Sequence, residues 1–251
     1  VCMGKAYFGI NSIEGSLDKN KGCEKAPSFL SKLFNVKIKE FVLTKNDIEA
    51  QQTEIYAQAK QIFCENTFGQ QIFFGGTHDI TFSLFKAFKE NNSSAKLIIF
   101  DAHADSDEGL NTVSHEDFVK GLITQKIIIK EELLLVGVRD VYPSEQEFFD
   151  SLNKISFGEL KTDFNLAKEK IIDFIKNDDI YFSFDVDVLN EEIMQATHYH
   201  PKEGLTKDQA KELLKIVMLK ANAIDLVEFN PDKITLSEDK LIKELFSSFF
   251  N

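Results

Sequence analysis

The chain has 251 residues, of which 43% are hydrophobic, and it carries a formal net charge of −12. That length and apolar content are enough for one globular domain over residues 1–251. The acidic balance and the lack of a basic stripe argue against a nucleic-acid partner. No apolar run approaches the ~20 residues that cross a bilayer, so we expect no membrane partner.

The cysteines and the N-terminus favour a cytoplasmic location. Cys2, Cys23 and Cys64 form no Cys-x-x-Cys pair, which is typical of free thiols in a reducing compartment. The first residues lack the basic region and the long apolar core of a signal peptide.

Short apolar runs alternate with stretches of helical periodicity along the chain. Strands are predicted at residues 6–10, 38–43, 71–74, 97–100, 132–137, 180–184 and 223–227. Helices are predicted to open within residues 22–30 and at Pro143, and to cover residues 47–65, 80–90, 118–123, 164–176, 206–220 and 237–249. This alternation predicts an α/β fold, a single-domain three-layer αβα architecture with a mostly parallel sheet of about eight strands.

The most informative stretch is residues 97–105, which read LIIFDAHAD. Its apolar half predicts a strand buried on both faces. Asp101, His103 and Asp105 then occupy alternate positions, and alternate side chains of extended backbone point the same way. In open parallel sheets, ligands bind at the C-terminal ends of the strands. Taken alone, this motif is also compatible with a solvated loop.

Two further strands end in ligand-type side chains. Residues 71–78 read QIFFGGTH and end in His78, after two glycines that allow a sharp turn and close approach to a ligand. Residues 180–188 read IYFSFDVDV and contain Asp185 and Asp187 at alternate positions. Three strands with the same kind of ending predict one shared metal site.

The charge of this set favours two ions. Four carboxylates carry four negative charges, which two divalent cations balance and one does not. Oxygen-rich ligands with a minority of imidazole suit Mn²⁺ better than a thiolate-bound zinc. Two such ions about 3.5–4 Å apart share a water and lower its pKa, so metal-assisted hydrolysis is predicted. The candidate ligands are His78, Asp101, His103, Asp105, Asp185 and Asp187.

These motifs resemble those of the ureohydrolases, the family of arginase, agmatinase and formiminoglutamase. The resemblance implies an arginase-like fold and two Mn²⁺ ions that activate a bridging hydroxide toward a guanidinium or amidine carbon. It extends over nearly the whole chain, in the segments GCEKAP, FGGTH, FDAHAD, GVRDVYP, SFDVDVL and DLVEFNP.

The same resemblance implies roles for three residues. Asp105 would hold the bridging hydroxide as well as a metal. Glu228 would pair with the cationic guanidinium or amidinium group of the substrate. His115 would shuttle a proton, and a neutral imidazole is suited to protonating the leaving amine. A surface histidine in a loop is the alternative for His115.

The chain departs from the family's pattern around the substrate. Tyr142 stands where arginases have Asp, and residues 196–200, ATHYH, replace a Gly-Thr-Gly-Thr-Pro loop. His198 and His200 either recognise an anionic or aromatic group or are ordinary loop residues. Arg139 either binds a carboxylate or is structural. We therefore expect an intact metal core, a remodelled rim, and a substrate other than arginine.

The leading hypothesis is a manganese-dependent hydrolase that cleaves a linear C–N bond of a small guanidino or formimino compound and releases urea or formamide. One alternative is a non-catalytic metal-binding relative, and another is a mononuclear zinc hydrolase resembling the deacetylases. Because ureohydrolases commonly assemble as trimers or hexamers, a homo-oligomer is also an open expectation.

Overall fold

The computed structural model describes residues 4–65, 69–108, 112–199, 202–235 and 238–250. Within these residues eight strands form one sheet, and every pairing in it is parallel. The strands are β1 (Lys5–Gly9), β2 (Lys39–Glu40), β3 (Gln70–Phe74), β4 (Lys96–Phe100), β5 (Leu133–Val136), β6 (Lys154–Ile155), β7 (Ile180–Asp185) and β8 (Ala221–Val227). Their spatial order is β2-β1-β3-β8-β7-β4-β5-β6.

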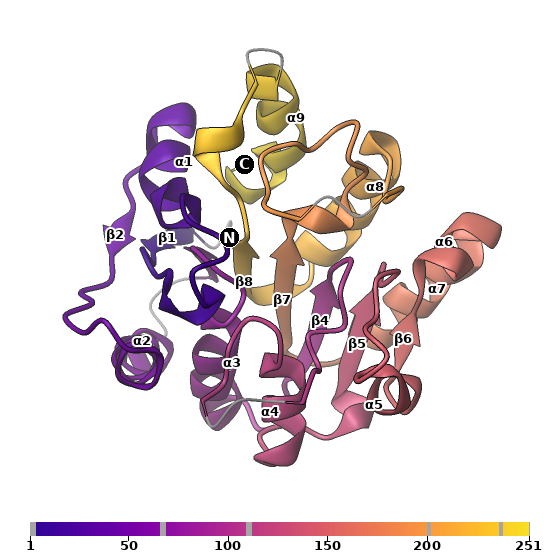
Figure 1. Cartoon of the computed structure of the whole chain (residues 1–251), viewed down its shortest axis with the longest axis horizontal. Coiled ribbons are helices and arrows are strands. Elements are labelled where there is room, and N and C mark those ends of the chain that lie inside the picture. The colour runs from indigo at the N-terminus through magenta and orange to yellow at the C-terminus, as the bar shows by residue number, and fades with distance from the viewer. Residues whose placement is uncertain (1–3, 66–68, 109–111, 200–201, 236–237, 251) are drawn as a thin grey trace.

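Helices cover both faces of the sheet, which confirms the predicted three-layer α/β fold. They are α1 (Ala26–Phe34), α2 (Ile48–Glu65), α3 (Ile80–Asn91), α4 (Phe118–Thr124), α5 (Gln146–Asp150), α6 (Phe157–Thr162), α7 (Phe164–Ile175), α8 (Lys207–Met218) and α9 (Glu238–Phe250). Figure 1 shows α1, α8 and α9 on one side of the sheet and α2, α3 and α4 on the other.

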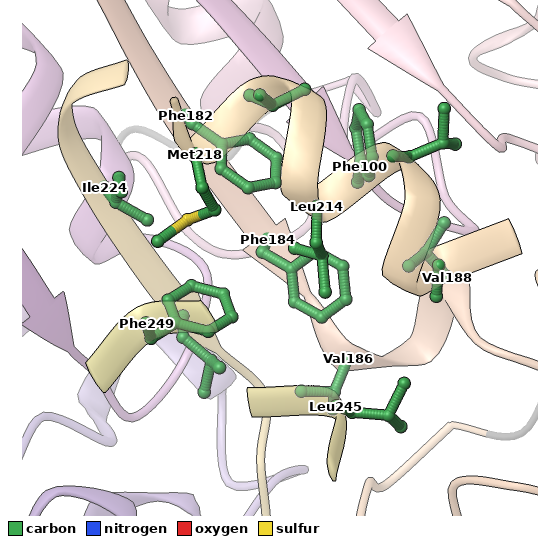
Figure 2. Close-up of a cluster of buried hydrophobic side chains, with 14 of the residues drawn as sticks. Phe100, Phe182, Phe184, Val186, Val188, Leu214, Met218, Ile224, Leu245 and Phe249 are labelled. Carbon is green, nitrogen blue, oxygen red and sulfur yellow. The ribbon is translucent and has the colours of Figure 1, made fainter. Parts of the chain in front are cut away.

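The strands contribute side chains to two separate hydrophobic cores, because alternate side chains of a strand face opposite sides of the sheet. In β4, Leu97 and Ile99 pack in the core under α2 and α3, while Ile98 and Phe100 pack in the core under α8 and α9. Phe100, Phe182 and Phe184 form part of the second core (Figure 2). Burial on both faces explains why these strands are continuous apolar runs in the sequence.

The structure corrects the predicted edges of the sheet. The strand predicted at residues 38–43 is reduced to β2, whose two residues are both exposed. The two-residue strand β6 has no counterpart in the prediction, because two residues are too few to show a period. The sheet is wholly parallel across the described residues rather than mostly parallel.

The structure confirms one predicted helix start and corrects another. Thr206 caps α8, since its side chain accepts a hydrogen bond from the backbone N–H of Gln209. Pro143 does not open a helix, because it lies in the turn before α5. Ser237, the predicted cap of the last helix, lies outside the described residues.

The glycine pair after β3 allows close packing of the neighbouring chain. A Cβ on Gly76 would lie 1.7 Å from the backbone oxygen of Ser12, so only glycine fits. Cys23 is a buried free thiol and Cys64 an exposed one. Among the described helices, none is both long and apolar enough to cross a membrane.

Candidate metal centre

The predicted metal ligands and Glu228 converge at the C-terminal ends of the four central strands, β3, β8, β7 and β4. His78 follows β3, and Asp101 begins the loop after β4. Asp185 is the last residue of β7, and Glu228 follows β8 directly. Parallel strands end at the same edge of a sheet, and the ligand motifs meet there for this reason.

One group of side chains surrounds His78. Its Nδ1 lies 2.9 Å from Asp101 Oδ2, 3.1 Å from Asp105 Oδ2 and 3.3 Å from Asp185 Oδ2. His78 and Asp101 are each only 1% exposed. Ligand atoms of His78, Asp101 and Asp105 are close enough together to hold one metal ion.

A second group surrounds His103. Its Nδ1 lies 2.9 Å from Asp187 Oδ2 and 3.5 Å from Asp101 Oδ1. Asp101, His103 and Asp187 also have ligand atoms close enough for one ion. Asp101 belongs to both groups, so the structure brings the six predicted ligands into two adjoining clusters.

Short-range hydrogen bonds and strained backbone fix these carboxylates. Asp101 Oδ1 accepts from the backbone N–H of His103 at 2.6 Å, and Asp187 Oδ1 accepts from that of Ala102 at 3.0 Å. Asp105 and Glu228 have positive φ angles of 45° and 59°. A non-glycine residue in this region costs about 1–3 kcal/mol, and such residues cluster at functional sites.

The buried carboxyl groups of the two clusters favour the binding of a cation. Burial raises the pKa of the Asp105 carboxyl well above its usual range, and the charge of Asp101 adds to the effect. Burial and the neighbouring Asp187 likewise raise the pKa of Asp185. His78 Nδ1 is buried and has no hydrogen-bond partner among the described residues, although carboxylate oxygens surround it. A divalent ion would use that lone pair and offset the carboxylate charge, so the residues fit a metal.

A buried polar network lies behind His78. Its Nε2 is 2.9 Å from Ser183 Oγ, which donates to Asp225 Oδ1 at 2.6 Å. Tyr181 and Thr81 hydroxyls donate to Asp225 Oδ2 at 2.7 and 2.9 Å. This network was not predicted from the sequence. The sequence pattern that could have indicated it is the alternation of Tyr181, Ser183 and Asp185 along one buried strand.

Glu228 and His115 adjoin the clusters. Glu228 Oε1 accepts from the backbone N–H of His78 at 2.8 Å and lies 3.8 Å from His115 Nδ1. His115 is only 6% exposed, which rules out a surface position for it. Burial raises the pKa of Glu228 to about 8 and lowers the pKa of His115 to about 4. His115 is therefore neutral at physiological pH.

Glu228 and His115 line a narrow pocket that opens to solvent, together with His78, His103, Asp105, Asp185 and Asp187. Besides ligand-type side chains, the pocket wall contains Tyr142, Tyr199, Glu116 and Glu145. Within the described part of the chain, no lysine or arginine lines it. Lys19, the nearby cation, forms an ion pair with Glu116.

Three other predicted residues have different outcomes. Arg139 is structural, because its guanidinium donates to the backbone carbonyls of Asp187 at 2.7 Å and of Gly137 and Leu189 at 3.3 Å. His198 is half-buried with its ring 5.9 Å from that of Tyr199, and it is not among the residues that line the pocket. His200 lies outside the described residues.

Replacement of His115 with asparagine is expected to make folding less sensitive to acid. Between about pH 6.5 and pH 4 the unfolded state binds a proton at His115 and the folded state does not, so stability falls as pH drops. We expect the wild type to lose about 2 kcal/mol more than His115→Asn between pH 7 and pH 5. Urea unfolding of both proteins with chelator present measures this difference. An equal loss in both would contradict the buried neutral imidazole.

Comparison with known proteins places this fold and site in a family. A model of the arginase family matches residues 16–248, so the chain belongs to the arginase family. The agmatinase of Blochmanniella floridana is 26% identical over 158 residues, which are 62% of this chain and 51% of that protein. The chain thus spans about half the length of this curated relative.

Solved structures share the fold. The formimidoylglutamase from Bacillus subtilis superposes with a TM-score of 0.88 at 16% identity, covering 98% of this chain and 87% of that one. The Entamoeba histolytica arginase in complex with L-ornithine gives a TM-score of 0.85 at 20% identity, covering 99% of both chains. These likenesses confirm the predicted arginase-like architecture.

Proposed function

We propose that this chain is a manganese-dependent hydrolase that cleaves a linear C–N bond of a guanidino or formimino compound. The observation that carries the proposal is the pair of His/Asp clusters that share Asp101. A single shared carboxylate between two clusters suits two adjacent ions better than one, which favours this function over a mononuclear zinc hydrolase.

The geometry suggests how the ligands would divide. His78, Asp105 and Asp185 would hold one ion, and His103 and Asp187 the other, with Asp101 between them. Mostly oxygen ligands with one imidazole per ion suit Mn²⁺. Two ions held by these residues would supply the Lewis acidity that lowers the pKa of water toward neutrality.

Glu228 and His115 would act on the organic substrate. Burial alone leaves Glu228 mostly protonated at neutral pH, but a cation placed beside it favours the ionised form. The resulting carboxylate, buried beside the clusters, would bind and orient a cationic amidinium or guanidinium group. The neutral His115 ring, 3.8 Å from Glu228, would hold a proton for the departing amine. Relatives named agmatinase support a substrate with this group.

The pocket wall supports a substrate other than arginine. Glu145 contributes a carboxyl group without a paired cation, and Glu116 already pairs with Lys19. The pocket-lining residues within the described ranges include no lysine or arginine to pair with a substrate carboxylate. A tail bearing a carboxylate would meet like charge there, whereas a neutral or cationic tail would not. Tyr142 and Tyr199 offer aromatic faces for such a tail.

Chelation followed by Mn²⁺ addition tests the metal requirement. We expect turnover to disappear with chelator and to return with Mn²⁺, because the ions generate the nucleophile. We also expect stability to fall on chelation, by about 2.7 kcal/mol for each ion lost, relative to protein at an ion concentration 100 times Kd. Rates, denaturant unfolding and bound-metal analysis on the same samples measure these effects.

A substrate panel tests the reaction. Mn-loaded protein is incubated with arginine, agmatine, guanidinobutyrate, guanidinopropionate and formiminoglutamate, and urea and formamide are assayed separately. We expect agmatine to exceed arginine in kcat/KM. Two bound ions with no product from any compound would instead indicate the non-catalytic relative, and one tightly bound zinc would indicate the mononuclear hydrolase.

A further inference from the structure

Asn20 is a buried amide that joins the two residues proposed to act on the substrate. It is fully buried, and its Nδ2 donates to Glu228 Oε2 at 2.5 Å. The same Nδ2 lies 3.4 Å from Nδ1 of His115. An amide N–H₂ has two hydrogens, so one group can serve both acceptors.

The N-terminal segment holds Asn20 in this position. Leu17, Asp18 and Gly22 all have positive φ angles, which turn the chain so that Asn20 enters the pocket wall. The carbonyl of Lys21 is fixed by Asn230 Nδ2 at 2.9 Å. The segment is also tied to the opposite wall, because the backbone N–H of His115 donates to the Gly15 carbonyl at 3.1 Å.

The direction of these contacts determines where the His115 proton sits. If Asn20 donates to Nδ1, that nitrogen is the acceptor of the neutral ring and the proton is on Nε2. If the proton were on Nδ1, two hydrogen-bond donors would face each other, the ring N–H and the N–H₂ of Asn20, and neither would have an acceptor there. His115 Nε2 is buried without a hydrogen-bond partner within the described residues, so its proton is not engaged by the fold.

Stability alone does not account for Asn20. Its Oδ1 is buried and has no hydrogen-bond partner within the described residues. A buried acceptor left unpaired costs about 1–3 kcal/mol of stability, so an apolar side chain of the same size would be more favourable here. Such local costs are expected at functional sites.

We propose that Asn20 is a positioning residue that orients the Glu228 carboxylate and holds neutral His115 as its Nε2–H tautomer. The inference deepens the proposed function, and its catalytic consequence depends on that function. With Asn20 in place, Glu228 presents a fixed carboxylate to a cationic amidine. His115 keeps its mobile proton on the nitrogen that faces away from Asn20.

The tautomer is measured by ¹⁵N NMR of the imidazole nitrogens in the full chain. Spectra are recorded after chelation and with Zn²⁺, since both samples are diamagnetic. We expect the wild type to show protonated Nε2 and bare Nδ1 at His115. Asn20→Asp has the same shape but presents an oxygen, so it should move the proton to Nδ1 or protonate the ring fully.

The matched control is Asn230→Asp. Asn230 is a buried amide in the same region, but it donates to Lys21 and not to Glu228 or His115. The left-handed turns and the hydrogen bond from His115 to Gly15 still hold Asn20 in this variant, so it should lose stability and keep the wild-type tautomer. In active Mn²⁺-loaded protein, Asn20→Asp should lower kcat/KM about 10- to 100-fold, the usual range for a supporting residue of this kind.

Each result decides the inference. A wild-type ring with its proton on Nδ1, or an unchanged tautomer in Asn20→Asp, overturns it. If Asn20→Asp does not fold, Asn20→Ala should give a mixture of tautomers, and an unmixed wild-type pattern there overturns it. If neither variant folds, the wild-type spectrum alone decides. A confirmed tautomer shift together with silence across the substrate panel would refute the proposed function and leave the Asn20 assignment standing.

Discussion

Asp101→Asn is expected to remove tight binding of both divalent ions and to reduce turnover by about 10³-fold or more. Among the described residues, Asp101 is the one that both candidate metal clusters share, so its loss should weaken both at once. Asparagine keeps the shape but loses the charge, and the Lewis-acid contribution at stake is several kcal/mol. Metal content by elemental analysis and initial rates on the best substrate measure the effect.

Asp117→Asn is the matched control for this prediction. Asp117 is also buried, at 5% exposure, but its carboxylate accepts from the backbone N–H and hydroxyl of Ser114 and does not belong to either cluster. The control should lower stability and retain two ions. Asp105→Asn and His103→Ala should each weaken mainly one ion. Two tightly bound ions in Asp101→Asn would refute the shared-carboxylate arrangement.

The candidate metal ligands could be predicted from the sequence because their spacing has a geometric meaning. Asp101, His103 and Asp105 alternate after an apolar run, as do Asp185 and Asp187, and the period of two puts each set on one side of the chain. The parallel sheet then brings the ends of β3, β7 and β4 to one edge. Motif and topology together specified the cluster without any knowledge of distances.

The rest of the site was not predictable in this way. Asn20 enters the pocket wall from a segment with three left-handed residues, and such a path has no period in the sequence. Ser183 and Asp225 meet because β7 pairs with β8, strands about 40 residues apart, and that register appears only in the folded sheet. The separation of Arg139 from the substrate pocket also depends on the loop that follows β7.

The two edge strands of the sheet were predicted poorly for a related reason. β2 and β6 have two residues each and lie at opposite edges of the sheet, where one neighbour is enough to define a strand. Central strands need apolar residues on both faces, which makes them visible in the sequence. Edge strands carry no such requirement, so their extent depends on a partner and not on composition.

Glu228→Gln is expected to weaken binding of cationic amidines about 10- to 150-fold. The change removes the negative charge opposite the substrate cation, and hydrogen bonds to charged groups contribute about 1.5–3 kcal/mol. Glutamine also has one acceptor where glutamate uses two, toward His78 and Asn20. The inhibition constant of guanidinium ion, measured against the best panel substrate, reports the loss of cation binding.

Glu145→Gln separates the lost charge from the lost hydrogen bond. Glu145 is also buried, lines the same pocket, and accepts from two backbone N–H groups, those of Ser106 and Tyr142. Both variants should therefore lose comparable stability, because each leaves one backbone or amide donor poorly paired. Only Glu228→Gln removes the charge beside the metal-ligand clusters, so only it should raise the guanidinium inhibition constant by tenfold or more. Equal increases in the two variants would show that general acidity of the pocket, and not the Glu228 carboxylate, selects the cation.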